Sequence, residues 1–142
     1  MGNTAPASAS QGTPRTPRVL IVEDHADTRE MYVEYLSGTF EVIAAGDGNE
    51  ALAQAKKHRP DAVVTDLSLP GIDGFELVSR LRRDPITSDA AVVCLSGFSG
   101  RSHEERARSA GVDRVVEKPC LPDALVQAII ETLAQHRDRS RP

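Results

Sequence analysis

The 142-residue sequence is poor in the features that mark several classes of protein. Its apolar stretches fall far short of the roughly 20 residues that cross a bilayer, and its start lacks the basic and apolar regions of a secretory signal. We therefore expect no transmembrane segment and a cytoplasmic protein. The two cysteines, Cys94 and Cys120, are too few and too far apart for a disulfide framework or a zinc site. Both are expected to be reduced and structural.

Strongly basic patterning is missing as well. The chain has 17 Lys and Arg against 21 Asp and Glu, a net charge of -4, and no long run of either basic residue. Proteins that bind the phosphate backbone of nucleic acid normally carry a basic patch, so no direct DNA binding is expected. The composition that is present, 39% hydrophobic and 27% charged residues, is ordinary for one globular domain of this length.

The two ends of the chain offer little to bury. Residues 1–17 are mostly Pro, Thr, Ala, Ser and Gly, and apart from Met1 they hold no aliphatic side chain larger than Ala. Residues 137–142 are charged or polar before a final proline. We expect a disordered N-terminal tail over 1–17, a folded domain over 18–136 and a disordered C-terminal tail over 137–142.

Within the expected domain, short β-branched runs alternate with longer stretches of helical periodicity. Most of these runs are continuously apolar rather than alternating, as strands covered on both faces should be. The pattern predicts an α/β fold: a doubly wound five-stranded parallel sheet with the flavodoxin-like order 2-1-3-4-5 and helices on both faces. The five runs are Val19–Val22, Phe40–Ala44, Ala62–Thr65, Ala91–Leu95 and Arg114–Val116.

Charged and hydroxyl side chains follow four of these predicted strands. In a doubly wound sheet, ligands bind outside the carboxyl ends of the strands, so these side chains should converge at one edge. Each of them alone would be ordinary: an acidic pair is usually a helix cap or a solvated turn, and serine and lysine are common in loops. Their occurrence at four separate strand ends favours a functional site. The residues are Glu23, Asp24, Asp66, Ser96 and Lys118.

Three carboxylates brought close together repel one another, by about 4 kcal/mol for each pair at 4 Å near a protein surface. A cation is expected among them. The donors are hard oxygens, and no His or Cys stands at ligand spacing, which favours Mg²⁺. Asp66, in the middle of the edge, could act as a carboxylate nucleophile toward phosphorus. Lys118 and the Ser96 hydroxyl would then bind phosphoryl oxygens.

Four segments occur in this order along the chain: Val19–Asp24, Asp47–Leu52, Asp61–Gly74 and Lys118–Pro119. Together they make the chain similar to a response-regulator receiver domain, the phospho-accepting part of two-component signalling. The similarity extends over about residues 18–133. It is carried by the opening strand with its acidic pair, the start of the second helix, the third strand with its loop, and a lysine-proline step.

The resemblance implies a role for each site residue. Asp66 would be the phosphorylated residue, and Glu23, Asp24, Asp66 and the backbone carbonyl of Ser68 would hold Mg²⁺. Ser96 would be the switch hydroxyl, and Lys118 would contact the phosphoryl group. The Lys118–Pro119 peptide bond is usually cis in this family, which an X-Pro bond permits. The protein would not be an enzyme beyond catalysing its own phosphorylation and dephosphorylation.

The sequence departs from the usual receiver at two places. Ser68 and Phe98 flank the path of hydrolytic water where relatives vary, so the phosphoryl lifetime does not follow from the sequence. Val115 stands where receivers commonly carry the Tyr or Phe whose inward rotation reports phosphorylation. We therefore expect the switch to work through Ser96 and the loop after it, with Phe98 either supplying the packing change or acting as a plain loop residue.

Three other readings of this fold fit less well. A pseudo-receiver without chemistry should have lost one of the site residues, and a flavin-binding protein should have a Ser-, Thr- or Gly-rich phosphate loop after the first strand. An aspartyl-phosphate phosphatase should carry a second Asp two residues after its nucleophile, where this chain has Ser68. We expect a stand-alone regulator, although a fragment of a larger kinase or regulator would look similar.

Partners follow from the resemblance and from the last predicted helix. Phosphoryl groups would come from a sensor histidine kinase or a phosphotransfer protein, and output would require a downstream protein target. The last helix carries two neighbouring apolar stripes, and the second is either core or a docking or dimer surface. The stripes are Leu125, Ala128 and Ile129, and then Val126, Ile130 and Leu133.

Overall fold

The computed structural model describes residues 15–97 and 101–139, and in this part of the chain a five-stranded sheet forms the centre. All neighbouring strands are parallel, and their order is β2-β1-β3-β4-β5. The predicted architecture and strand order are confirmed. The strands are β1 (Arg18–Val22), β2 (Glu41–Ala45), β3 (Ala62–Asp66), β4 (Ala91–Ser96) and β5 (Arg114–Glu117).

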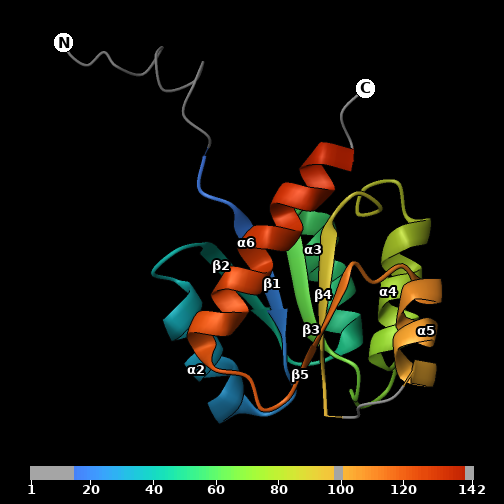
Figure 1. Ribbon diagram of the computed structural model, residues 1–142, viewed down its shortest axis with the longest axis horizontal. Coiled ribbons are helices and arrows are strands. Elements are labelled where there is room, and N and C mark those ends of the chain that lie inside the picture. Colours follow the sequence, from blue (N-terminus) through green and yellow to red (C-terminus); the bar gives the residue numbers. More distant parts are fainter. Residues whose placement is uncertain (1–14, 98–100, 140–142) are drawn as a thin grey trace.

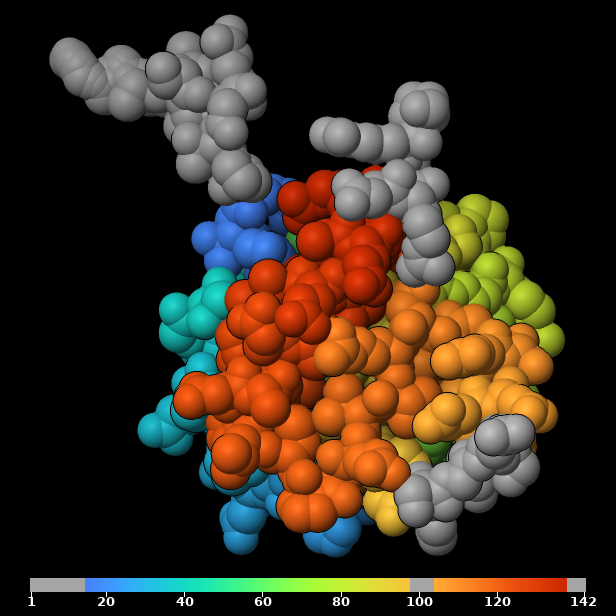
Figure 2. Space-filling model, in the orientation of Figure 1, coloured from blue at the N-terminus to red at the C-terminus, as the bar shows by residue number. Residues whose placement is uncertain are grey.

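Helices cover both faces of this sheet, as Figure 1 shows. One face packs against α2 and α6, and the other against α3, α4 and α5, because side chains of successive strand residues point to opposite faces. Figure 2 shows α6 running across the near face, where it shields the sheet from solvent. The helices are α2 (Ala26–Leu36), α3 (Gly48–His58), α4 (Gly74–Arg83), α5 (Arg101–Ala110) and α6 (Pro122–Arg139).

The central strands are buried from end to end. Every residue of β3 and β4 is buried, which explains why their sequences are almost continuously apolar up to the site residues, with the buried Thr65 as the exception. On one face Ile21 and Val64 pack with Leu36 and Ile129, and on the other Leu20 and Val63 pack with Leu81. The sheet is therefore fixed by packing from both sides, and its carboxyl edge is a rigid base for the loops.

Two of the helices begin with an acidic cap. The Asp47 side chain accepts a hydrogen bond from the Glu50 backbone N–H at 2.8 Å, while Glu50 accepts one from the Gly46 N–H at 2.7 Å. Asp73 caps α4 in the same way, accepting from the Glu76 N–H at 2.9 Å. Such caps satisfy backbone donors that the first helical turn leaves without partners, so the chain turns sharply from strand edge to helix.

Several details differ from the sequence prediction. Strand β2 starts one residue later than expected, because the Phe40 N–H donates to the Leu36 carbonyl at the end of α2, at 2.9 Å, and pairing with β1 begins at Glu41. The second apolar stripe of α6 is divided: Leu133 is buried in the core, whereas Ile130 is exposed. Helix α6 also continues to Arg139, past the expected domain limit at His136. Apolar periodicity alone does not show which residues of a wide apolar stripe reach the core or at which residue the helix ends.

Some predictions fall on parts of the chain that the structure does not describe. The expected disorder of residues 1–14 and 140–142 and the role of Phe98 lie outside the described residues. Cys94 and Cys120 are free thiols, the first buried and the second half-buried. Among the described helices, none has the length and apolar character required to cross a bilayer.

Candidate functional site

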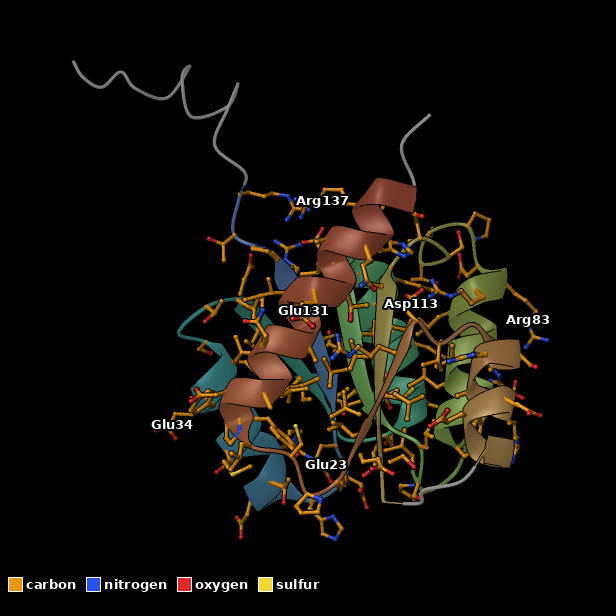
Figure 3. All side chains as sticks on the ribbon, in the orientation of Figure 1. Glu23, Glu34, Arg83, Asp113, Glu131 and Arg137 are labelled. Atoms are coloured by element: carbon orange, nitrogen blue, oxygen red, sulfur yellow. The ribbon has the colours of Figure 1, made fainter. Side chains whose placement is uncertain are left out.

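The predicted site residues lie at the carboxyl edge of the sheet. Asp66 ends β3, Ser96 ends β4, and Glu23 and Lys118 directly follow β1 and β5. Figure 3 shows Glu23 at this edge, while Arg137 lies at the far end of the molecule. The edge is assembled from four strands because parallel strands all deliver their carboxyl ends to the same side.

Asp66 is held in place by contacts to both of its carboxylate oxygens. The residue is 7% exposed, at the end of the central strand β3. Its Oδ1 accepts a hydrogen bond from the Ser68 backbone N–H at 2.9 Å, and its Oδ2 contacts the Nζ of Lys118. A buried carboxylate with a fixed orientation is suited to in-line attack on an electrophile.

Lys118 is anchored by its backbone as well as by its charge. Its N–H donates to the Ser96 carbonyl at 2.8 Å, and its peptide bond to Pro119 is cis, as the resemblance implied. Burial by itself would lower the pKa of Lys118, but the hydrogen bond to Asp66 and the negative charges of Asp66 and Glu23 outweigh it, so the pKa is raised. Lys118 therefore stays charged while it faces two carboxylates.

Ser96 is buried beside Asp66 on the neighbouring strand. It pairs with Glu117 in the β4–β5 register, and the residue before it, Leu95, pairs with Asp66. The Leu95 carbonyl accepts the Leu67 N–H at 3.1 Å, which ties the start of the loop after β3 to β4. The hydroxyl residue and the candidate nucleophile are thus placed on adjacent strand ends.

The acidic pair forms a compact group with a residue that the sequence analysis did not consider. Glu23 is 3% exposed, Asp24 is more open, and one ligand atom from each of Glu23, Asp24 and His25 lies within 4.8 Å of the others. The expectation that no histidine stands at ligand spacing was wrong. The signal was the position of His25 directly after the pair, where the chain turns into α2 and brings the ring back over the carboxylates.

The donor chemistry of this edge fits a divalent cation. Glu23 and Asp24 place two carboxylates at the end of β1. The negative charge of Glu23 also helps to raise the pKa of Lys118, the lysine that contacts Asp66. Such clustered negative charge is stabilised by a cation, and carboxylate oxygens suit Mg²⁺. Arg29, which sequence reasoning also missed, donates to the Glu23 backbone carbonyl at 2.9 Å and so fixes the strand end that presents the pair.

The loop after β3 approaches the start of α4 very closely. The Gly74 N–H donates to the Leu67 carbonyl at 3.1 Å, and a Cβ at Gly74 would lie 2.5 Å from the Asp66 carbonyl oxygen. Gly71, with φ +77°, makes the turn between them in a conformation that glycine adopts without strain. This packing closes one side of the space around Asp66.

Val115 lies where an aromatic residue would rotate in the usual receiver. It pairs with Cys94 in the sheet and is half-buried against the cluster that contains Val92 and Ala107. A valine that is already part of this packed cluster has no polar tip and no long ring to exchange between an outward and an inward position.

Comparison with known proteins identifies the family. The chain matches the family described as the response regulator receiver domain over residues 19–130. It is 37% identical over 139 residues to the transcriptional regulatory protein PdtaR of Mycobacterium tuberculosis, covering 96% of this chain and 64% of that one. It is 30% identical over 112 residues to the polar-differentiation response regulator DivK of Brucella anthropi, covering 78% and 91%.

Other similarities involve a much longer protein and a solved structure. The virulence sensor protein BvgS of Bordetella bronchiseptica is 37% identical over 144 residues, and the chain spans only 12% of its length. The chemotaxis response regulator CheY4 of Vibrio cholerae superposes with a TM-score of 0.78 at 28% identity, covering 82% of this chain and 98% of that one. The fold, the strand-end residues and these matches agree, and the chain belongs to the response regulator receiver domain family.

Proposed function

We propose that Asp66 is the phosphoryl acceptor of this receiver. The supporting observation is the buried Asp66 carboxylate at the centre of the carboxyl edge, with Lys118 on one oxygen and the Ser68 N–H on the other. These two contacts fix the orientation of the carboxylate. A carboxylate so placed can attack phosphorus and form an acyl phosphate.

The transfer step balances with a phosphorylated histidine as donor. An Asp66 carboxylate oxygen forms a bond to phosphorus as the bond from phosphorus to the donor's imidazole nitrogen breaks. The electron pair of the broken bond stays on that nitrogen, and the product is the aspartyl phosphate. Lys118 would then move from the carboxylate to a phosphoryl oxygen, where its positive charge offsets the charge gained by the site.

The same proposal assigns the cation site. Glu23, Asp24, Asp66 and the Ser68 carbonyl would hold Mg²⁺, of which Glu23 and Asp24 already form a compact group. When bound, Mg²⁺ supplies positive charge to the transferring phosphoryl group. Glu23 is nearly buried and fixed through its backbone, whereas Asp24 is more open to solvent and would be the ligand that adjusts on binding.

The signalling role implies partners and a switch without an aromatic flip. We propose a sensor histidine kinase or phosphotransfer protein upstream and a protein target downstream, in the cytoplasm, with catalysis limited to the protein's own phosphorylation and dephosphorylation. Ser96 would turn toward the phosphoryl group, and the change would stay near the end of β4 because Val115 is already packed. The expected phosphoryl-dependent surface is therefore local.

Intact-mass measurement tests the acceptor. Incubation with acetyl phosphate and Mg²⁺ should add one phosphoryl group to the parent protein and none to Asp66→Asn, and EDTA should prevent the addition. Asp73→Asn is the matched control: it alters the Asp at the far end of the loop that follows Asp66, and Asn still caps α4. An adduct that persists in Asp66→Asn, or that Asp73→Asn abolishes, would place the acceptor elsewhere.

Thermal unfolding tests the cation site independently of phosphorylation. Mg²⁺ that binds only the folded protein should raise the melting temperature by mass action. Asp24→Asn should raise the melting temperature of the metal-free protein, because it relieves repulsion with Glu23, and should abolish the response to Mg²⁺. A melting curve that millimolar Mg²⁺ leaves unchanged would count against a shared carboxylate site.

A further inference from the structure

His25 brings a nitrogen donor into the carboxylate group. Its Nδ1 lies 3.3 Å from the Glu23 Oε2 and 3.5 Å from the Asp24 Oδ1. The ring comes from the residue that caps α2, and the cap makes no hydrogen bond through that side chain. The imidazole is thus turned toward the acidic pair instead of the end of the helix.

The spacing of these atoms is that of ligands around a single ion. Ligand atoms about 2.1 Å from one metal ion lie roughly 3.0 Å apart at octahedral angles and roughly 3.4 Å apart at tetrahedral angles. The two distances from Nδ1, 3.3 and 3.5 Å, lie close to this range. The three donors can therefore approach one ion with small adjustments of the open Asp24 and His25 side chains.

The backbone holds the imidazole over the pair while leaving it reachable. The His25 N–H donates to the Glu23 Oε2 at 3.0 Å, which fixes the position of the ring's attachment point. The His25 side chain is 79% exposed, and that of Glu23 is 3% exposed. A cation can therefore approach from solvent, bind the buried Glu23 carboxylate and contact the exposed His25 nitrogen.

We propose that His25 is an additional protein ligand of the cation site, beside Glu23 and Asp24, and gives it a preference for first-row transition ions over Mg²⁺. Mg²⁺ is a hard ion that binds oxygen and keeps its waters, whereas imidazole favours ions such as Co²⁺, Ni²⁺ and Zn²⁺. The inference rests on the proposed cation site at Glu23 and Asp24 and specifies which ions that site selects. His25 is its specificity-determining residue.

The competing explanation is that His25 interacts with the acidic pair only through its charge and does not bind the metal ion. An imidazolium beside two carboxylates would be an ordinary ion pair, and it would compete with every divalent cation alike. Removing the ring would then leave the affinities for Mg²⁺ and Co²⁺ unchanged or raise both together. Removing a ligand would instead weaken Co²⁺ binding selectively, so the two explanations predict opposite signs for Co²⁺.

Metal titration of the full chain separates these outcomes. Calorimetry with Co²⁺ and with Mg²⁺ should be carried out on the parent, His25→Gln, Asp24→Asn and the control His58→Gln, which alters a histidine of α3 outside the group. We expect His25→Gln to weaken Co²⁺ on the order of tenfold or more and to change the visible Co²⁺ spectrum. Mg²⁺ binding should be unchanged, and His58→Gln should behave as the parent.

The variants distinguish failure of this inference from failure of the proposed site. If Mg²⁺ binding requires Asp24 but His25→Gln leaves Co²⁺ affinity and spectrum unaltered, or raises the affinity for both ions, His25 is not a ligand and the inference is overturned alone. If neither Mg²⁺ nor Co²⁺ binding depends on Asp24, the proposed cation site falls and the inference falls with it. Unfolding curves of the metal-free variants check that each still folds.

Discussion

Replacing Gly74 with alanine should damage both stability and phosphorylation. Gly74 begins α4 and packs against the end of β3 and the loop that follows Asp66. A Cβ at Gly74 would lie 2.5 Å from the Asp66 carbonyl oxygen and 2.6 Å from the Leu67 Cα. Both neighbouring atoms belong to the backbone, so a side-chain rotation cannot relieve the contact. The start of α4 and the loop must move apart.

The size of the effect follows from the overlap. Ordinary carbon contacts are about 3.5 Å or longer, so the two segments must separate by about 1 Å. Overpacking of this kind costs typically 1–3 kcal/mol, while the gain in helix propensity from Gly to Ala, about 1 kcal/mol in a helix interior, is smaller at the first helical residue. For a domain of this length the melting temperature should fall by roughly 3–10 °C.

Phosphorylation should suffer because the moved segment adjoins the acceptor. Asp66 belongs to the central strand and is held on both sides, so most of the shift should fall on Leu67 and the start of α4. Since a 1 Å misplacement near a reacting group can cost about 100-fold, we expect labelling by acetyl phosphate to slow by about tenfold or more.

Gly38→Ala is the matched control for this experiment. A Cβ at Gly38 would have the Tyr35 carbonyl oxygen as its nearest neighbour at 3.7 Å, an ordinary contact. Its stability should change by no more than about 0.5 kcal/mol. Urea unfolding and the rate of intact-mass labelling give both quantities. Equal stability and equal labelling for Gly74→Ala and the parent would refute the argument from close approach.

Three further predictions concern other residues. The pKa of Lys118 is raised in the folded protein, so its contribution to stability is fully present below its usual pKa of 10.5 and is lost as pH rises through the folded value. The free energies of unfolding of the parent and of Lys118→Met, measured in urea, should therefore converge at alkaline pH. Burial raises the pKa of the Cys94 thiol, so iodoacetamide should label Cys120 first and Cys94 only on unfolding; early labelling of Cys94 would contradict this. Arg82 donates hydrogen bonds to the carbonyls of Ser88, Ala90 and Gly111 and to the carboxylate of Asp113. Arg82→Met should therefore lower the free energy of unfolding by about 3–5 kcal/mol, and the surface variant Arg83→Met by less than about 1 kcal/mol. Equal losses for the two variants in urea unfolding would show that the buried contacts contribute little.

The sequence by itself determined the fold class and the sheet edge at which the candidate site residues gather. Continuous apolar runs such as Val63–Val64 and Val92–Val93 are local signals, and strands covered on both faces have few alternatives. Because parallel strands present their carboxyl ends together, placing Asp66 and Lys118 after two such runs already predicts that they meet. Their contact in the structure agrees with that prediction.

The tertiary structure decided which residues of a pattern face the core. Met31, Tyr32, Tyr35 and Leu36 recur at helical spacing, yet Met31 and Tyr35 are exposed and only Tyr32 and Leu36 are buried. Periodicity defines a wide apolar arc, but the packing of α2 against α6 and the sheet selects the part of it that loses contact with water. Local sequence carries no information on that choice.

The tertiary structure also decided the finer composition of the site. The position of His25 over the acidic pair, the bond from Arg29 to the Glu23 carbonyl and the approach of Gly74 to Asp66 depend on how the chain turns after each strand. These turns are set by contacts between segments far apart in the sequence, such as β1 with β3 and α2 with α6. The sequence therefore shows that a carboxylate is present at a strand end. The direction in which its side chain points depends on how the whole sheet edge packs.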